Sequence, residues 1–210
     1  MGYNFRRVDP RSDEDMSKYV GLIKKLSDFC NDNQTFDEEK LKWMRVRMGA
    51  IEYATGSNEL CPIDENSDEM AFVCEHDGDF VGFIDVAFYH VVDGERPDDD
   101  IGIIHDMYVD DKHRGLTSFT LLKMAVDSLL SKGKNYAICN VQEDNPNRFL
   151  HFALANNNVV CERECKRRDG SKTMDYTLLI DLHETKDMTI LQFAKKLRNV
   201  NAEKVMNKRR

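Results

Sequence analysis

The sequence predicts a mixed α/β fold, in which one mixed sheet is flanked by helices and followed by a short helical tail. The predicted elements run strand, helix, helix, hairpin, strand, helix, strand, helix, hairpin, so strands and helices alternate only in the middle. That order favours a sheet with both parallel and antiparallel neighbours over a regularly wound one. The chain of 210 residues is 41% apolar and 32% charged, as expected of a globular domain with an extension.

The N-terminal segment predicts one short strand and two helices. Residues 3–8 alternate weakly and stop at a proline. Ser12 precedes residues with apolar side chains at helical spacing as far as about Phe29, with three acids in the first turn. Asp37 begins a second helical pattern, which continues to Ile51 or Tyr53.

The middle of the chain changes to strands. Residues 70–75 and 80–92 flank the turn His76–Asp79 and predict a hairpin, and residues 101–109 follow an acidic loop as a third strand. Strict alternation in this third strand would place Ile103, His105, Met107 and Val109 on one face and Asp106 on the other.

The remaining elements follow from the same signals. Residues 116–130 are predicted to form an amphipathic helix, with Gly133 as the signal for its end. Residues 136–141 are predicted to form a strand. Asn145–Pro146 opens a helix to about Ala155. Residues 159–166 and 173–182 predict a second hairpin, and apolar spacing over 190–197 predicts a short amphipathic helix.

Charge divides the chain into two parts. Residues 1–183 form the predicted domain, and residues 184–210 form a basic, partly helical extension. The extension has eight Lys/Arg and three Asp/Glu, whereas the net charge of the whole chain is −8. An acidic body favours cationic partners, and nucleic-acid binding is expected only through the basic tail, if at all.

Other classes of function lack a signal. The first residues have no apolar core of a secretory signal and no stretch approaches a membrane span, so we expect a cytoplasmic protein with reduced thiols and no membrane contact. Cys161 and Cys165 lie four apart without a second ligand pair, so no metal site is expected. The sequence is compatible with a monomer and with a homo-oligomer.

One turn has the composition of an anion site. Lys112, His113 and Arg114 precede Gly115 at the start of the helix at 116–130. Backbone N–H groups at a helix N-terminus, together with basic side chains and hydroxyls, can bind a phosphate. The same residues are also compatible with an ordinary capped and solvated helix start.

The layout of residues 3–182, together with this turn, resembles the GNAT superfamily of acyl-CoA-dependent N-acyltransferases. The family pattern is an apolar-x-Val strand end, then Gln/Arg-x-x-Gly-x-Gly/Ala opening a helix. Met107 and Val109 fit the strand end, and Arg114 and Gly115 fit the loop. Thr117 and Phe119 replace the two motif glycines. The resemblance implies acetyl-CoA as co-substrate, held by a strand end, a loop and one later asparagine: Met107, Tyr108, Val109, Arg114, Gly115, Leu116, Thr117, Ser118, Phe119, Thr120 and Asn145.

A second family landmark follows the strand at 136–141. Val141 and Asn145 match it, whereas Arg148 stands where the family usually has alanine. Phe152 occupies the position of a tyrosine that protonates the leaving thiolate in many members. A phenyl ring donates no proton, so that role is lost, and Phe152 is read better as a core aromatic.

The residue expected to act as the base is His105. The amine must lose a proton as it attacks the thioester, and an unperturbed imidazole titrates near neutral pH. In the family the base is often a Glu or His on this strand. A histidine in a strand is also a common packing residue, and that reading stays open. Cys139 lies in an apolar strand and is expected to belong to the core.

The leading interpretation is an N-acyltransferase that moves an acetyl group from acetyl-CoA to a primary amine. The acceptor would be a small cationic amine or a protein lysine or N-terminus. The alternative is a catalytically degenerate protein of the same fold that serves as a binding or structural module, because two motif glycines and the tyrosine are substituted.

Overall fold

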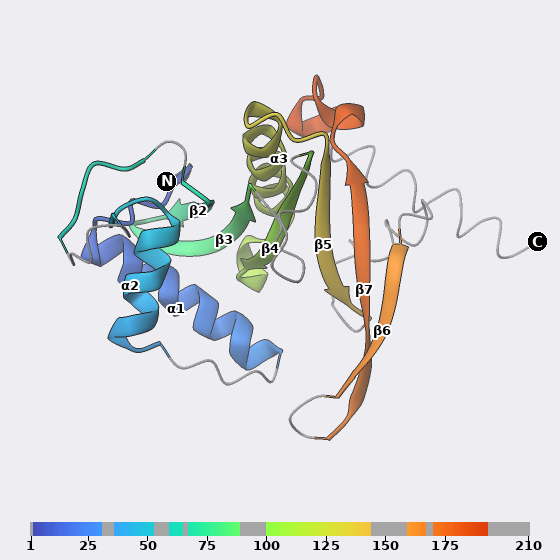
Figure 1. The fold of residues 1–210 in the computed structure, drawn as a ribbon, viewed down its shortest axis with the longest axis horizontal. Helices are drawn as coiled ribbons and strands as arrows, with labels where there is room; N and C mark the ends of the chain where they lie inside the picture. Colours follow the sequence, from blue (N-terminus) through green and yellow to red (C-terminus); the bar gives the residue numbers. More distant parts are fainter. Residues whose placement is uncertain are drawn as a thin grey trace, which may run out of the picture.

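A computed structural model confirms the mixed α/β fold. It describes residues 2–30, 36–52, 59–64, 67–88, 100–143, 159–166 and 170–192. Seven strands form one sheet in the order β1-β2-β3-β4-β5-β7-β6, in which only β4 and β5 pair in parallel (Figure 1). The strands are β1 Tyr3–Arg7, β2 Glu69–His76, β3 Asp79–Ala87, β4 Ile101–Val109, β5 Tyr136–Gln142, β6 Val159–Lys166 and β7 Lys172–Asp181.

The helices begin at the residues that the sequence indicates. The described α-helices of ten or more residues are α1 Asp13–Phe29, α2 Glu38–Arg47 and α3 Leu116–Ser131, and the short 3-10 helices are η2 Asp111–His113 and η3 His183–Thr185. The Ser12 hydroxyl accepts a hydrogen bond from Asp15 N, and the Asp37 carboxylate accepts one from Lys40 N. α2 ends earlier than expected, because the chain takes a left-handed turn at Gly49 (φ +78°).

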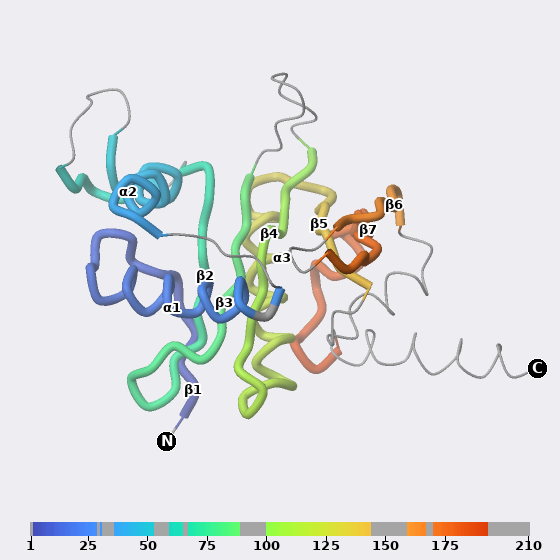
Figure 2. The backbone as a smooth tube through the Cα atoms, turned by 90° about the horizontal axis from the view of Figure 1, so that it is seen from below, coloured from blue at the N-terminus to red at the C-terminus, as the bar shows by residue number. Residues whose placement is uncertain are grey.

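Helices pack on both faces of the sheet around β3 and β4. Alternate residues of β2 and β3 enter two separate apolar clusters: Cys74 and Ile84 pack with α3, whereas Val73 and Phe83 pack with α1. In both Figure 1 and Figure 2, α1 and α2 lie together and apart from α3. The two faces can therefore present different ligand sites on the same strand.

α3 packs closely on the beginning of β4. A Cβ at Gly102 would come within 2.3 Å of Leu129 Cδ2, so any larger residue would require the Leu129 side chain to shift. The buried stripe of α3 includes Leu122, Val126 and Leu129, as its sequence predicts. The helix that follows β4 is thereby fixed against the sheet, with its N-terminus near the end of that strand.

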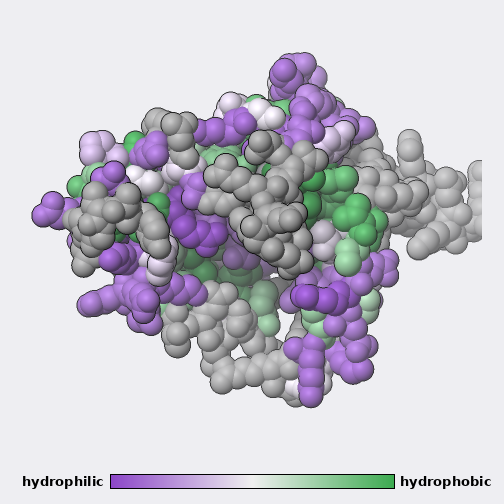
Figure 3. Space-filling model, in the orientation of Figure 1, coloured by the Kyte–Doolittle hydropathy of each residue, from purple (hydrophilic) through white to green (hydrophobic). Residues whose placement is uncertain are grey.

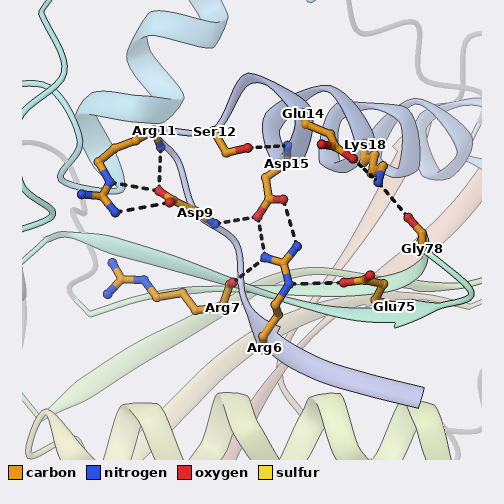
Figure 4. A network of polar contacts seen from close by, with 10 residues as sticks. All are labelled: Arg6, Arg7, Asp9, Arg11, Ser12, Glu14, Asp15, Lys18, Glu75 and Gly78. Atoms are coloured by element: carbon orange, nitrogen blue, oxygen red, sulfur yellow. Dashed lines mark hydrogen bonds and ion pairs between the residues drawn. The ribbon is translucent and has the colours of Figure 1, made fainter. Parts of the chain in front are cut away.

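A polar network fixes the first strand to the first helix (Figure 4). Arg6 donates hydrogen bonds from both terminal nitrogens to the Asp15 carboxylate, one of them at 2.9 Å, and its Nε donates to Glu75 on β2. The backbone N–H of Asp9 also donates to Asp15. These hydrogen bonds, led by those from Arg6, lower the pKa of Asp15.

Three expected segments lie outside the described residues: most of the acidic loop before β4, the helix expected from Asn145, and the basic tail beyond residue 192. Residues 190–192 are helical, and Met188 packs against the core cluster beside α3. The division between a domain at 1–183 and an extension at 184–210 therefore stays a prediction.

Candidate active site

The two parallel strands at the centre of the sheet pair over only part of their length. β4 pairs with β5 from Ile101 to Ile104, opposite Tyr136 to Cys139. Beyond that point β4 continues to Val109, and no described strand pairs with this edge. Figure 1 shows the two strands adjacent where they start and diverging toward their ends. A strand edge of this kind can pair with an extended ligand through backbone hydrogen bonds.

A bulge in β4 begins at the residue where its pairing with β5 stops. Ile84 of β3 pairs with Met107, but Val86 pairs with Ile104, so Asp85 stands opposite both His105 and Asp106. The extra residue reverses the alternation of side chains along β4.

The bulge corrects one prediction from the sequence. Strict alternation placed His105 on the same face as Met107 and Val109. In the structure Met107 and Val109 pack with the cluster beside α3, together with Ile104, whereas His105 and Asp106 both line a cavity with residues of α1 and α2.

That cavity has a volume of about 180 Å³ and lies between α1, α2 and the strands β2, β3 and β4. One part of its wall is apolar and the other is charged. Its lining consists of Tyr19, Ile23, Phe36, Lys40, Met44, Arg47, Met48, Glu69, Met70, Ala71, Asp85, His105 and Asp106. On the face that Figure 3 shows, hydrophobic side chains form two separate areas, right of the centre and below it, with hydrophilic ones around them.

His105 has the properties of a neutral base. The His105 side chain is 38% exposed, but partial desolvation of the imidazole, and then the positive charge of Arg47, lower its pKa, against a smaller opposing effect of Asp106. Its Nε2 lies 3.4 Å from Glu69 Oε1, and Glu69 also pairs with Arg47. The lowered pKa favours the unprotonated imidazole, and the Glu69 carboxylate orients the ring, as a general base requires.

Asp85 is the most unusual group in this cavity. Burial, and then the nearby charge of Asp106, raise its pKa well above the usual range, so the protein favours the protonated carboxyl. The Tyr19 side chain interacts with it, and Tyr19 is itself buried with a raised pKa. Sequence reasoning missed both residues; an aspartate within the apolar run Phe80–Phe88 was the available signal.

The expected cofactor residues of β4 and α3 lie around the end of β4 and the start of α3. Val109 is buried and Met107 partly buried beside α3, whereas Tyr108 packs toward α1 and donates a hydrogen bond to Asp110 at 2.9 Å. Burial and that hydrogen bond raise the pKa of Tyr108 to about 12. Arg114 donates to the Val109 carbonyl and pairs with Asp111 at 2.6 Å.

The first turn of α3 combines exposed and buried positions. Gly115 is exposed with φ +101°, which a non-glycine residue would adopt only with strain, and Leu116 is 54% exposed. Thr117 is buried and interacts with Cys74, and the Thr120 hydroxyl donates to the Leu116 carbonyl.

Ser118 and Phe119 in the same turn are half-buried, and Phe119 packs against the core. The threonine hydroxyls are thus engaged within the protein, and the backbone N–H groups of the first turn remain the natural anion donors.

Three other residues that the sequence singles out have different outcomes. Asn145 and Phe152 lie outside the described residues, so their predicted roles stay predictions. Cys139 is buried in β5, as expected of a core residue, and burial raises its pKa to about 12. A thiol of that kind is not an activated nucleophile.

Two other kinds of feature are lacking in the described part of the chain. None of its helices has the length and apolar character to cross a membrane. It also has no group of three or more His, Cys, Asp or Glu side chains arranged to hold a metal ion.

Comparison with known proteins gives a family and a fold. The sequence model of the acetyltransferase (GNAT) family matches residues 34–152. No curated protein matches the sequence at a significant level.

Several solved structures share the fold at low sequence identity. An N-acetyltransferase from Staphylococcus aureus Mu50 has a TM-score of 0.63 and 13% identity, over 87% of this chain and 99% of that one. The yncA protein from Salmonella typhimurium, solved with its cofactor acetyl-CoA, has a TM-score of 0.61 and 15% identity, over 87% and 95%. A ribosomal-protein-alanine N-acetyltransferase from Brucella melitensis has a TM-score of 0.56 and 15% identity, over 85% and 99%.

Proposed function

Since the chain belongs to the acetyltransferase (GNAT) family, whose chemistry is acyl transfer, we propose that it moves an acetyl group from acetyl-CoA to a primary amine. The observation that carries this proposal is the position of His105. It is the first residue of β4 beyond the last pair with β5, and it lines the cavity between α1, α2 and the sheet.

The acyl donor fits the side of β4 on which α3 begins. The unpaired edge of residues 105–109 can hold an extended chain with amides, as in the pantetheine arm of acetyl-CoA, by strand-like hydrogen bonds. The pyrophosphate would bind at the first turn of α3, where the backbone N–H groups, the helix dipole and Arg114 act together. Yet Arg114 is already paired with the exposed Asp111, so its contribution requires exchange of that surface ion pair.

The acceptor fits the opposite face. An amine in the cavity would approach the thioester at the point where the two strands diverge, with His105 beside it. The lone pair of the amine forms the new C–N bond, the C–S bond breaks, and CoA leaves as its thiolate. His105 takes the proton that the amine loses, and the thiolate is a tolerable leaving group without a side-chain acid.

Calorimetry with acetyl-CoA and with CoA tests the donor half of this proposal. Binding of both ligands with similar affinity would support it, because the nucleotide and the pantetheine arm supply the contacts. Absence of binding at millimolar ligand would exclude acetyl transfer from acetyl-CoA. Binding without transfer to any primary amine would favour the alternative of a degenerate module, which the substituted motif residues Thr117 and Phe119 support.

A further inference from the structure

Among the polar groups of the cavity that the proposed transfer does not use, Asp85 has a buried oxygen without a hydrogen-bond partner in the described structure. Asp85 lies in the middle of β3 between Ile84 and Val86, which are both fully buried. The buried oxygen is Oδ1. A buried carboxyl oxygen without a partner costs free energy, and the cavity wall is where a ligand can supply the missing partner.

The charged and titratable groups around Asp85 come from each element of the cavity wall. They are Tyr19 on α1, Lys40 and Arg47 on α2, Glu69 on β2, and His105 and Asp106 on β4. Arg47 is paired with Glu69, and the Lys40 ammonium lies 4.2 Å from the centre of the Phe36 ring. Both cations thus have contacts of their own, and Asp106 repels a negative charge on Asp85.

The apolar part of the cavity lining indicates the chemistry of the rest of the ligand, beyond its polar end. Ile23, Phe36, Met44 and Met48 form an apolar wall beside the carboxyl groups. An aliphatic stem suits that wall. A second positive charge inside the cavity would meet Lys40 and Arg47, so the fitting ligand has a single ammonium group on an unbranched apolar chain.

We propose that Asp85 is the group that recognises the acceptor, and that it binds the ammonium end of an aliphatic primary amine and releases its own proton to solvent in doing so. The carboxyl enters the complex as a carboxylate, the ammonium keeps its three protons on binding, and one proton passes to the buffer. Before attack, His105 takes one proton from the bound ammonium, which frees the nitrogen lone pair, and the second proton leaves the nitrogen as the C–S bond breaks and passes to the CoA thiolate or to solvent. The inference rests on the proposed function for the identification of this cavity as the acceptor site.

Calorimetry at pH 7.5 in two buffers with different ionisation enthalpies tests the proposal directly. The ligands are n-butylamine, its neutral analogue 1-butanol, and Nα-acetyl-lysine methylamide, which carries the same ammonium on a peptide. The measured enthalpy of n-butylamine binding should differ between the two buffers. The difference should correspond to the release of nearly one proton to the buffer for each amine bound. Because the pKa of His105 is lowered, its neutral form is favoured at this pH, and the released proton is assigned to Asp85.

Two variants of the same strand separate recognition from general effects of charge. Asp85→Asn should abolish the dependence on buffer and weaken amine binding about tenfold or more, since a charge-assisted hydrogen bond is lost. Asp79→Asn removes an exposed carboxyl at the start of β3 and should change neither. 1-Butanol should bind equally weakly to all three proteins. A preference for n-butylamine over the lysine derivative would identify a small-molecule acceptor, and the reverse a protein lysine.

Three outcomes would overturn the inference: no binding of either amine, binding without proton release, or equal amine affinity of the Asp85→Asn variant and wild type. Transfer assays distinguish a failure of this inference from a failure of the proposed function. Amine binding with proton release but no acetyl transfer would refute the proposed function alone. Acetyl transfer with an unchanged KM for amine in Asp85→Asn would refute the role of Asp85 alone.

Discussion

His105 on β4 and Glu69 on β2 approach to 3.4 Å between Nε2 and Oε1, although β3 lies between their strands in the sheet. Glu69 also pairs with Arg47 of α2, so one carboxylate connects the proposed base to the helix that covers the cavity. The contact depends on the β2–β3 register, in which Glu69 lies opposite Ala87, and on the bulge that turns His105 toward it.

Replacing Glu69 with Gln should change the base without removing it. Loss of the carboxylate leaves the imidazole beside an unpaired Arg47, which lowers the pKa of His105 further and makes it a weaker base. We expect the rising limb of the pH–rate profile to move to lower pH and turnover to fall by up to roughly tenfold. Glu162→Gln on the exposed strand β6 is the matched control, and equal profiles for the two variants would contradict this role of Glu69.

Reversing the charge at Arg114 should weaken binding of acetyl-CoA. A glutamate there adds a repelling charge beside the proposed pyrophosphate site, so we expect a loss of about tenfold or more in affinity. Arg163→Glu on β6 should have little effect. S-acetylpantetheine lacks the pyrophosphate, and its affinity should be unchanged by Arg114→Glu. Equal losses for acetyl-CoA and S-acetylpantetheine would place the pyrophosphate elsewhere.

Asp85 should make the protein less stable at neutral pH than its amide variant. Its folded pKa is raised above the unfolded value, so its favourable contribution is complete at low pH and is lost as pH rises toward the folded pKa. Asp85→Asn should therefore be the more stable protein at pH 7, and the difference should shrink as pH falls toward 4, by up to about 1.4 kcal/mol per pH unit. Urea denaturation at several pH values measures this. A difference independent of pH would contradict the raised pKa, and Asp79→Asn is the control.

Asp15 should have the opposite dependence on pH. Its folded pKa is lowered, so its contribution is present above the unfolded value and is lost as pH falls through the folded pKa. Asp15→Asn should lower the free energy of unfolding at pH 7 by about 2 kcal/mol, a figure kept small because Arg6 is one-third exposed. The gap should close in acid. Asp13→Asn, whose 92% exposed carboxylate pairs with Arg45, should stay near wild type. Equal losses for both variants would contradict this assignment.

The sequence predicts the elements well, because their signals are local. Ser12 and Asp37 cap the helices that they precede, and the strand at 159–166 has the bounds that its composition indicates. The bulge in β4 carries no such signal, because the register between two strands decides it. A shift of one residue reversed the face of His105 and brought it next to Asp85 and Glu69, which are distant in sequence. The sequence therefore indicates His105 as a candidate base but not the residues that the fold places beside it.

The most direct test of the central proposal is an acetyl-transfer assay from acetyl-CoA to n-butylamine, with wild type, His105→Ala and His183→Ala. His183 is an exposed histidine in η3, remote in sequence from the cavity lining. Wild type should release CoA thiol with turnover rising through an apparent pKa lower than that of an unperturbed imidazole. His105→Ala should lower turnover by roughly 10²-fold or more with unchanged affinity for acetyl-CoA, and His183→Ala should match wild type. Equal turnover of wild type and His105→Ala would remove His105 from the mechanism, and no transfer by wild type that still binds acetyl-CoA would contradict the proposed activity itself.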